Sequence, residues 1–599
     1  MNRQRHLEIS TNRMNSAIDG TTARHVSAIV LTAALGAGSA AMGQSLKPYR
    51  LHVFRDEDGV PVNVGGVADV LAPYTNETGS RSKIGINNLG IVGGTYEVDE
   101  DVYHGFVWFP NTLGVSGMAF KPRVLLDIHD FGVQGDISMV NDVCASRALV
   151  GFLGEAPTVG EALGAGEAQA FELDLVNETI TAHTLHTTDG PYSTAYGTND
   201  GTTATIVGET SYDCGDEAYR QRAFRTTWSQ SGAAGSMTDL PMESTAFSAS
   251  SNDVGRSAIL FVAAGDDNGC ADLSTPSEPC DKVACSMVCW APDIGALRWS
   301  GLSPTSVTVL DDLIEPPQDD PDAAVAARAV NDNGDSSGWG WIEVAEDQCE
   351  WRATFWNGSS TTAHNLGDTM PDGQGGNQSW AEGISRRDGG GCVTVVGMNT
   401  QVEHGLVWYG FDDDWCVADL NYVAFRTDAD PAGDPPCVTT TYTIKRAFDI
   451  NQYRHVTVLV EGPEYNHLGV LTSAGDFNGD LKVDGTDRQA LLDHYCASGC
   501  DACELGYDLD GDDDVDATDL AYLIGTYYSG SSLARVPTIC ECSQLAGPSS
   551  ACLLDEESAL AVLGFSGWED FCAWLADADA DAADAACETL AYLLRGDEE

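Results

Sequence analysis

A short sequence pattern recurs along most of this chain of 599 residues, and it limits the fold more than any other feature. One copy begins with IGINNLGIVGG at Ile84 and closes with HGFVW at 104–108. It contains an apolar stretch, an Asn-rich turn at 87–90, a strand ending in Val-Gly, and a closing strand that ends in an aromatic residue. Asn and Gly mark turns because they tolerate backbone angles that other residues avoid. Each copy therefore predicts several short β-strands joined by tight turns.

Seven copies of the pattern can be aligned on their turns. The spacing of the turns ranges from 53 residues, between Asn199 and Asn252, to 79 residues, between Asn252 and Asn331. Each copy has room for about four short strands. The predicted turns lie at Asn87, Asn141, Asn199, Asn252, Asn331, Asp388 and Asn451.

Short strands at regular spacing favour an all-β array that closes on itself. Closure hides the sheet edges that would otherwise pair with other chains. The sequence therefore predicts a mainly β fold, with a repeat-built β-propeller over residues 44–473 and seven blades favoured. Six or eight blades, or a β-solenoid, are the alternatives, because the fourth and fifth copies are poorly preserved.

The units resemble the extracellular HAF repeat, which is named after its His-Ala-Phe signature. The signature occurs here as HGFVWF, QAFEL, RAFRTTW and HGLVWY, preceded by an Asn turn and Val-Gly. The resemblance covers roughly residues 80–472 and implies export and a repeated β fold, with no settled activity.

Three histidines, His104, His404 and His467, open equivalent closing strands and raise the question of a metal ring. The matching residues of the other copies are Gln, Arg and Ser, and Arg and Ser are poor ligands beside His. We therefore expect these positions to make hydrogen bonds, and we expect the aromatic residues that end the closing strands to pack in the core.

Two acidic segments behind the repeats have the spacing of a calcium loop. Calcium takes six to eight oxygen ligands, and a twelve-residue loop supplies them from positions 1, 3, 5, 7, 9 and 12. DFNGDLKVDGTD begins at Asp476, and DLDGDDDVDATD begins in the same register at Asp508. Position 7 contributes only its backbone carbonyl, so a lysine is compatible there. The predicted ligand residues are Asp476, Asn478, Asp480, Lys482, Asp484 and Asp487 in the first loop, and Asp508, Asp510, Asp512, Asp514, Asp516 and Asp519 in the second.

Each loop ends in Asp at position 12 and is followed by apolar residues at helical spacing. These features resemble the dockerin module, whose duplicated loop–helix units bind calcium and then a cohesin domain. The resemblance covers about 474–530, and it implies two calcium ions and a cohesin-like partner. It also implies that positions 10 and 11 face that partner, which are Gly485, Thr486, Ala517 and Thr518.

The loops depart from an ordinary EF-hand at position 6, where Leu481 and Asp513 replace the usual glycine. A residue with a side chain makes the sharp turn at this position harder. At position 8 both loops carry an apolar residue, Val483 and Val515, and we expect these two to pair as a short β-bridge.

The beginning of the chain has the features of an export signal. Residues 1–43 contain the apolar run VSAIVLTAALGAGSAAMG, preceded by Arg24 and His25, and cleavage after Ala41 or Gly43 fits its small residues. A retained membrane anchor is the alternative, but a spanning helix needs about 20 apolar residues. The sequence predicts a secreted or cell-surface protein with no membrane span once the signal is removed.

Composition narrows the classes of partner. The chain has 91 acidic and 30 basic residues, for a formal charge of −61. Such a surface repels nucleic acid and anionic lipid, and it suits calcium. The 18 cysteines are an even number, which in an exported chain predicts disulfides. Local pairs such as Cys270 with Cys280, or Cys416 with Cys437, fit this expectation.

The last part of the chain, residues 531–599, is predicted to form a cysteine-containing linker and an acidic helical tail. Disorder in its Asp/Ala run is the alternative.

The favoured function is a secreted or cell-surface calcium-binding protein with a propeller for display or recognition and a dockerin-type docking module. One alternative is a secreted polysaccharide-degrading enzyme, a glycoside hydrolase or lyase, with carbohydrate as its ligand. Another is a purely structural envelope protein. The sequence contains no G-x-S-x-G, H-E-x-x-H or Gly-rich phosphate loop. Acidic residues are too numerous to nominate a catalytic pair, so no catalytic residue is assigned.

Overall fold

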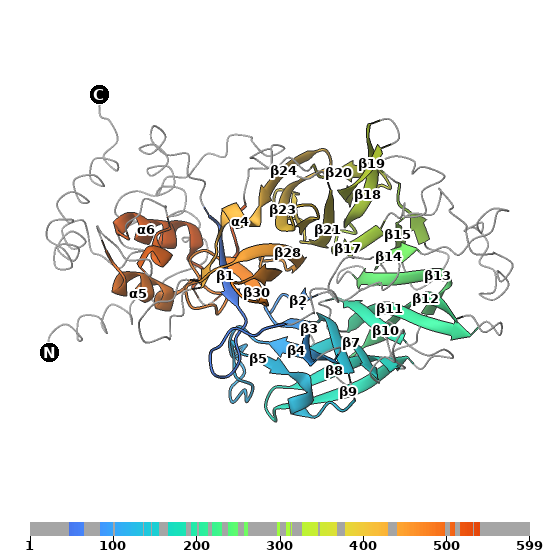
Figure 1. Cartoon of the computed structure of the whole chain (residues 1–599), viewed down its shortest axis with the longest axis horizontal. Helices are drawn as coiled ribbons and strands as arrows, with labels where there is room; N and C mark the ends of the chain where they lie inside the picture. The colour runs from blue at the N-terminus through green and yellow to red at the C-terminus, as the bar shows by residue number, and fades with distance from the viewer. Residues whose placement is uncertain are drawn as a thin grey trace.

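The computed structural model consists mainly of β-strands, which form six large sheets arranged as a propeller (Figure 1). This confirms the predicted mainly β propeller fold. The structure describes residues 47–64, 84–99, 102–135, 137–144, 147–154, 166–186, 193–199, 203–213, 219–229, 238–249, 257–261, 296–299, 307–311, 313, 326–345, 348–367, 378–428, 440–496, 504–509, 515–530 and 532–538. The predicted signal at 1–43 and nearly all of the predicted tail at 531–599 lie outside these residues.

Four of the sheets contain four antiparallel strands each, taken in chain order. The first holds β2 (Gly85–Ile86), β3 (Val92–Asp99), β4 (Val102–Trp108) and β5 (Leu125–Asp127). The second holds β6 (Ile137–Val143), β7 (Ala148–Gly154), β8 (Gly166–Asp174) and β9 (Thr179–His186). The later two hold β17 (Ala326–Val330), β18 (Ser336–Ala345), β19 (Gln348–Trp356) and β20 (Ala363–Asn365), then β21 (Ser379–Ile384), β22 (Val393–Asn399), β23 (His404–Phe411) and β24 (Asp414–Asp419).

A longer sheet of seven strands takes the place of two blades. It runs through β10 (Ser193–Thr198), β11 (Ala204–Asp213), β12 (Tyr219–Trp228), β13 (Thr238–Ala249), β14 (Ser257–Phe261), β15 (Leu297–Trp299) and β16 (Val307–Val309). The first half of β13 pairs with β12 and its second half pairs with β14. The third and fourth sequence units therefore share one sheet, so the arrangement has six blades and the favoured count of seven is not confirmed.

The last sheet joins the two ends of the repeat region. Its strands β28 (Thr443–Ile450), β29 (Val456–Glu461) and β30 (Asn466–Ser473) are completed by β1 (Tyr49–Val53) and the short β25 (Ala424–Phe425). The strand β1 is antiparallel to β30, from Tyr49 opposite Ser473 to Val53 opposite Gly469. The earliest described strand of the chain thus closes the ring.

The Asn turns seen in the sequence fasten one blade to the next. Asn87 accepts the backbone N–H groups of Leu89 and Ile91 at 2.9 Å each, which shapes its own turn. Its Nδ2 donates to the carbonyl of Cys144 in the next blade at 3.0 Å, and Asn451 Nδ2 donates to the Asn87 carbonyl at 3.1 Å. The repeated asparagine therefore both forms the turn and joins neighbouring sheets.

In the second unit the predicted turn at Asn141 was wrong by three residues. The turn closes between Cys144 and Arg147, where the Arg147 N–H donates to the Cys144 carbonyl at 3.1 Å. Arg147 takes the left-handed φ of 62° that Gly90 takes, at 79°, in the first unit. Asn141 lies inside β6, and its Nδ2 donates to the Ala195 carbonyl of the next blade at 2.7 Å. Cys144 opens this turn, whereas Asn87 and Asn451 open theirs, so the Asn signal of the second unit stands three residues too early.

The glycine of the Val-Gly pair faces a β-bulge in the neighbouring strand. Gly151, Gly208 and Gly397 each lie opposite the residue that precedes such a bulge. A Cβ added to any of the three would lie 1.8–2.0 Å from a carbonyl oxygen of that strand. Only glycine allows this close approach of two backbones, which explains why the pair recurs.

After β30 the chain forms a small helical region, which lies beside β1 and β30 (Figure 1). It contains α5 (Gly485–Asp493), η3 (Glu504–Tyr507), α6 (Ala517–Tyr522) and the single π turn η4 (Leu523–Tyr527). Its core includes Phe477, Val483, Leu491, Val515 and Leu523. A helix therefore follows each acidic loop, as the apolar spacing predicted.

The expected pairing of Val483 with Val515 was wrong. Val515 forms an isolated antiparallel bridge with Cys496, and the Val483 carbonyl accepts the N–H groups of Ser529 and Gly530. Each loop therefore pairs with the segment that follows the other loop's helix, while both valines still pack in one core.

Among the residues that the structure describes, no helix combines the length and apolar character needed to cross a bilayer. Each expected disulfide pair has at least one member outside the described residues, so disulfide pairing stays a prediction.

Candidate functional site

The first acidic loop starts three residues after β30 and folds around the side chain of its first residue. Asp476 Oδ1 accepts the N–H groups of Gly479 at 2.8 Å and Asp480 at 3.2 Å, and Oδ2 accepts the N–H of Leu481 at 3.0 Å. The Asp476 side chain has no exposed surface. Position 1 thus faces the inside of the loop, as the calcium-loop spacing requires.

The last residue of the same loop closes it from the other side. Asp487 Oδ1 accepts the N–H of Phe477 at 2.8 Å, and Oδ2 accepts the N–H of Asp484 at 2.9 Å. Asp484 in turn caps α5 by accepting the Thr486 N–H at 2.7 Å. These contacts join positions 2, 9 and 12 and start the helix at the point where the loop ends.

The second loop is closed in the same way. Asp519 Oδ2 accepts the N–H of Asp516 at 2.7 Å, and its Oδ1 accepts the N–H of Leu509. In both loops, therefore, the carboxylate at position 12 binds the N–H groups of positions 2 and 9. Asp508 is buried, whereas the predicted ligands Asp510, Asp512 and Asp514 lie outside the described residues.

The turn at position 6 has the left-handed backbone geometry that glycine favours, although the residue there is a leucine. Leu481 has φ 65°, in the left-handed region that side chains seldom adopt. Its side chain is fully buried and packs in a propeller cluster that includes Ile86, Phe106 and Trp108. Burial of this leucine offsets the strained backbone and explains why glycine is not required here.

The carboxylates of the first loop repel one another. Burial, with the charges of Asp487 and Asp480, raises the pKa of Asp476 well above its ordinary value. Burial also raises the pKa of Asp487 to about 6, and it raises the pKa of Asp480. Within the described part of the chain, none of the three forms an ion pair with Lys or Arg. The imidazole beside Asp476 is that of His52. Burial lowers the pKa of His52 to about 3, so the ring is neutral.

The donor set of the first loop fits a calcium ion better than a metal that needs nitrogen or sulfur. The spacing offers the side-chain oxygens of Asp, Asn and Asp at positions 1, 3 and 5, together with the carbonyl of Lys482. In the described ranges, no three His, Cys, Asp or Glu side chains converge as a ready-made metal site. An ion would therefore have to draw these oxygens together.

The propeller binds this loop through its backbone carbonyls. His52 Nε2 lies 3.0 Å from the Asp476 carbonyl oxygen, Arg123 Nη1 donates to the Asn478 carbonyl at 2.9 Å, and Asn111 Nδ2 donates to the Asp480 carbonyl at 3.0 Å. These are positions 1, 3 and 5 of the loop. The sequence analysis missed the three propeller residues, because no local pattern links them to a loop more than 350 residues away.

A second contact comes from Arg50, which lies on β1. Its Nε donates to the Ala474 carbonyl and its Nη2 to the Gly506 carbonyl, each at 2.7 Å. The guanidinium also lies over the rings of Phe425 and Phe477, at 4.8 and 4.7 Å from their centroids. Arg50 thereby holds both halves of the helical region against the closing strand.

The residues expected to face a partner can be placed in part. Gly485 and Thr486 are exposed in the first turn of α5. Ala517 and Thr518 begin α6, but their side chains are not described. The exposed pair fits a contact surface, and the partner itself stays a prediction.

The histidines that open closing strands make hydrogen bonds, as predicted. His104 Nδ1 lies 2.6 Å from Asp127 Oδ2, and His404 Nδ1 lies 2.7 Å from Asp419 Oδ2. Both partners are on the neighbouring outer strand or at its end. The aromatic residues Trp108 and Trp408 at the other end of these strands are buried in core clusters, which confirms their expected packing.

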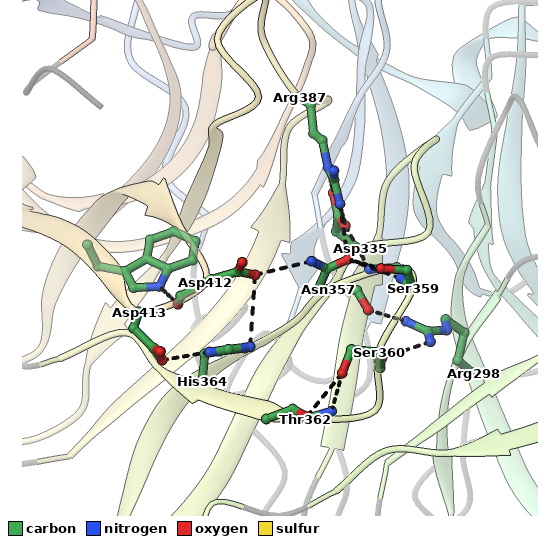
Figure 2. A network of polar contacts seen from close by, with 12 residues as sticks. Arg298, Asp335, Asn357, Ser359, Ser360, Thr362, His364, Arg387, Asp412 and Asp413 are labelled. Atoms are coloured by element: carbon green, nitrogen blue, oxygen red, sulfur yellow. Dashed lines mark hydrogen bonds and ion pairs between the residues drawn. The ribbon is translucent and has the colours of Figure 1, made fainter. Parts of the chain in front are cut away.

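A polar network on the blade of β17–β20 is another place where charged groups meet (Figure 2). Asp335 has no exposed surface and binds Arg387 of the next blade through Nε at 2.8 Å and Nη2 at 2.5 Å. Arg298 donates to the carbonyls of Asn357 and Ser360, at 3.0 Å each. These contacts join neighbouring blades, and the buried Asp335 is saturated by its partners, so we assign the network to the stability of the ring.

Comparisons with known proteins add little beyond the fold. No family model matches the chain, and no curated protein matches it. Among solved structures, it is similar to the β-propeller domain of the Trilobed protease from Pyrococcus furiosus, at 9% identity and TM-score 0.32 over 65% of this chain and 93% of that one. It is also similar to Trypanosoma rangeli sialidase, at 8% identity and TM-score 0.29 over 60% of this chain and 57% of that one. A third similar structure is the polysaccharide lyase Uly1, at 9% identity and TM-score 0.29 over 72% and 98%.

Likenesses of this size say nothing about activity. The assignment of the propeller rests on the order and pairing of the sheets in this structure.

Proposed function

We propose that this chain is an exported calcium-binding protein, in which paired loops hold two calcium ions beside a propeller that serves for display or recognition. One observation carries the proposal: both loops close by the same two hydrogen bonds on the carboxylate of position 12. A chance acidic stretch has no reason to repeat this geometry. In the first loop, which lies wholly within the described residues, Asp476, Asp480 and Asp487 form no ion pair with Lys or Arg, and a divalent cation would offset the cost of burying them.

In the first loop the ion would be held by the side chains of Asp476, Asn478, Asp480 and Asp487 and by the Lys482 carbonyl, with Asp484 acting directly or through water. The second loop would use the matching residues from Asp508 to Asp519. The ion neutralises the carboxylates, and the chain contributes their placement and their burial.

Calcium titration of the full chain, followed by calorimetry, tests the proposal. The protein is first freed of metal with a chelator and desalted, and magnesium serves as the comparison ion. We expect two calcium ions to bind, and Asp487→Asn and Asp519→Asn each to abolish the binding of one. Absence of calcium binding at millimolar concentration, or two intact sites in the variants, would contradict it.

Export and docking complete the proposal. The resemblance to HAF repeats and the apolar run within 1–43 support a secreted or cell-surface location, which cell fractionation tests. The exposed Gly485 and Thr486, beside the cap of α5, support a docking role toward a cohesin-like partner. A calcium-dependent pull-down of a cohesin domain by the native chain, compared with Thr486→Arg, tests that role. Loss of capture in the variant supports it, and no capture in calcium contradicts it.

The alternatives receive no specific support. No described residues form an arrangement that we assign to polysaccharide cleavage, and carbohydrate stays an untested ligand. If calcium binds and no partner docks, the structural envelope protein becomes the better interpretation.

A further inference from the structure

The ring of blades is held closed at one seam. There, β1 pairs with β30 over five residue pairs, although their residues lie more than 400 positions apart in the chain. The blade of β2–β5 follows β1 in the chain, so β1 and this first blade lie on the N-terminal side of the seam, and β30 lies on its C-terminal side. A segment that follows β30 and binds β1 or the first blade therefore secures the closure.

The first acidic loop is such a segment. It follows directly from β30, and it is bound by His52 on β1 and by Asn111 and Arg123 of the first blade. The buried side chain of Leu481 extends the contact, because it reaches the turn at Gly90 between β2 and β3.

The residues whose carbonyls the propeller binds are also residues that an ion would hold. The propeller binds the carbonyls of loop positions 1, 3 and 5, whose side chains carry the predicted ligand oxygens. An ion that draws these side-chain oxygens together would also fix the positions of the carbonyls that the propeller binds. Without an ion, repulsion between the carboxylates opposes this arrangement.

A later segment of the chain, which contains Ala534 and Val536, also contacts the loop. Ala534 donates its N–H to the Leu481 carbonyl at 2.8 Å, and the Ala534 carbonyl lies 2.7 Å from His455 Nε2. Val536 then pairs with Tyr453 and packs in the core of the last sheet. The loop is thus held between the propeller and this returning segment.

We propose that the first loop is a calcium-operated latch, which locks the closure of the propeller ring when the ion binds. The inference rests on the calcium binding proposed above and goes beyond it, because it assigns the ion an effect on a domain that supplies none of its ligands. The loop would thus stabilise the closed ring in addition to any docking role.

Tryptophan fluorescence reports mainly on the propeller. Eleven of the 13 tryptophans precede residue 474, and the other two, Trp568 and Trp574, lie far behind the loops. Thermal unfolding of the full chain is followed with calcium and with chelator. We expect calcium at a hundredfold excess over its dissociation constant to raise the tryptophan midpoint by roughly 3–5 °C.

The decisive variant carries Asn111→Ala and Arg123→Ala. These substitutions remove two side-chain hydrogen bonds to the loop carbonyls and leave every predicted ligand intact. Both side chains lie near the surface, so the variant should fold, and near-UV circular dichroism checks that it does. Asn177→Ala is the matched control, since this exposed asparagine is bonded only within its own turn. We expect the double variant to bind calcium but to lose at least half of the midpoint shift, and the control to keep all of it.

Three results would overturn the latch. If the native chain binds calcium and its tryptophan midpoint does not move, calcium binding stands and the latch fails. If the double variant keeps the full shift, the hydrogen bonds of Asn111 and Arg123 to the loop carbonyls do not transmit the effect, and the proposed latch is wrong. If no calcium binds, the proposed function and the latch fail together.

Discussion

The two acidic loops share their spacing, their closure at position 12 and a helix that follows, yet their surroundings differ. The first loop is bound by β1 and by the first blade, and its Leu481 lies in a propeller core. The described parts of the second loop pack within the helical region, where Leu509 and Val515 belong to its core. Similar local sequences therefore form similar turns, while tertiary contacts decide which turn affects the rest of the molecule.

The largest expected difference between the loops concerns one leucine in each. Leu481→Ala removes a fully buried side chain from a propeller cluster and should lower the free energy of unfolding of the propeller by about 3 kcal/mol. Leu509→Ala should loosen the helical region and leave the tryptophan-detected transition nearly unchanged. Denaturant unfolding followed by tryptophan fluorescence measures both. Equal losses in this transition would show that the two loops are coupled to the propeller alike.

The next largest difference between the two loops is expected when each loop in turn loses its ion. In saturating calcium, Asp487→Asn should reduce propeller stability by about 2.7 kcal/mol, which is the linkage expected at a hundredfold excess of ligand. Asp519→Asn should mainly affect the far-ultraviolet signal of the helices. Thermal unfolding with both probes checks the difference. A larger tryptophan shift for the second-loop variant would reverse the comparison.

Acid should weaken the segment that covers the first loop. His455 is buried, its Nε2 faces the Ala534 carbonyl at 2.7 Å, and burial lowers its pKa to about 4. Since the unfolded chain takes up this proton near pH 6.5, the stability contributed by the neutral ring is present above pH 6.5 and is lost as the pH falls toward 4. The loss should reach about 2 kcal/mol at pH 5.

The variant His455→Gln isolates that effect. Its free energy of unfolding should depend less on pH between 6.5 and 5 than that of the native chain, with both proteins measured in calcium. Identical slopes would exclude this histidine as the source.

The smallest expected effect is at the exposed surface of the first loop. Thr486→Ala should change stability by no more than about 0.5 kcal/mol, because the side chain is exposed. Calcium affinity should also stay the same in a calorimetric titration, since position 11 supplies no ligand. A marked loss of either would mean that this threonine supports the loop rather than a partner contact.

Much of the fold follows from local sequence signals. The Asn turns, the Val-Gly pairs and the helices that follow the loops are all short-range patterns in the sequence. The signal failed at Asn141, because Cys144 opens the turn that asparagine opens at Asn87 and Asn451. It also failed for the blade count, because the sequence does not show that β13 pairs with β12 along one half and with β14 along the other.

The loop spacing of the candidate site is visible in the sequence, whereas its setting against the propeller is not. The spacing from Asp476 to Asp487 reflects local backbone geometry and is visible in the sequence. The contacts of Asn111 and Arg123 with the loop span 369 and 355 residues, and nothing near these residues marks them. The left-handed Leu481 looked like a weakness in the sequence, and burial in a distant blade explains it.

Closure by β1 has a consequence for how the protein is made. Besides the two-residue β25, β1 pairs over five residues with β30, which begins only at Asn466, so the main hydrogen-bonding edge of β1 stays unpaired until about 420 more residues have been synthesised. At ordinary rates of translation this delay is on the order of 20–80 s. During that interval an exposed β edge invites pairing with other chains, and a chaperone bound near residues 49–53 would protect the polypeptide until the ring can form.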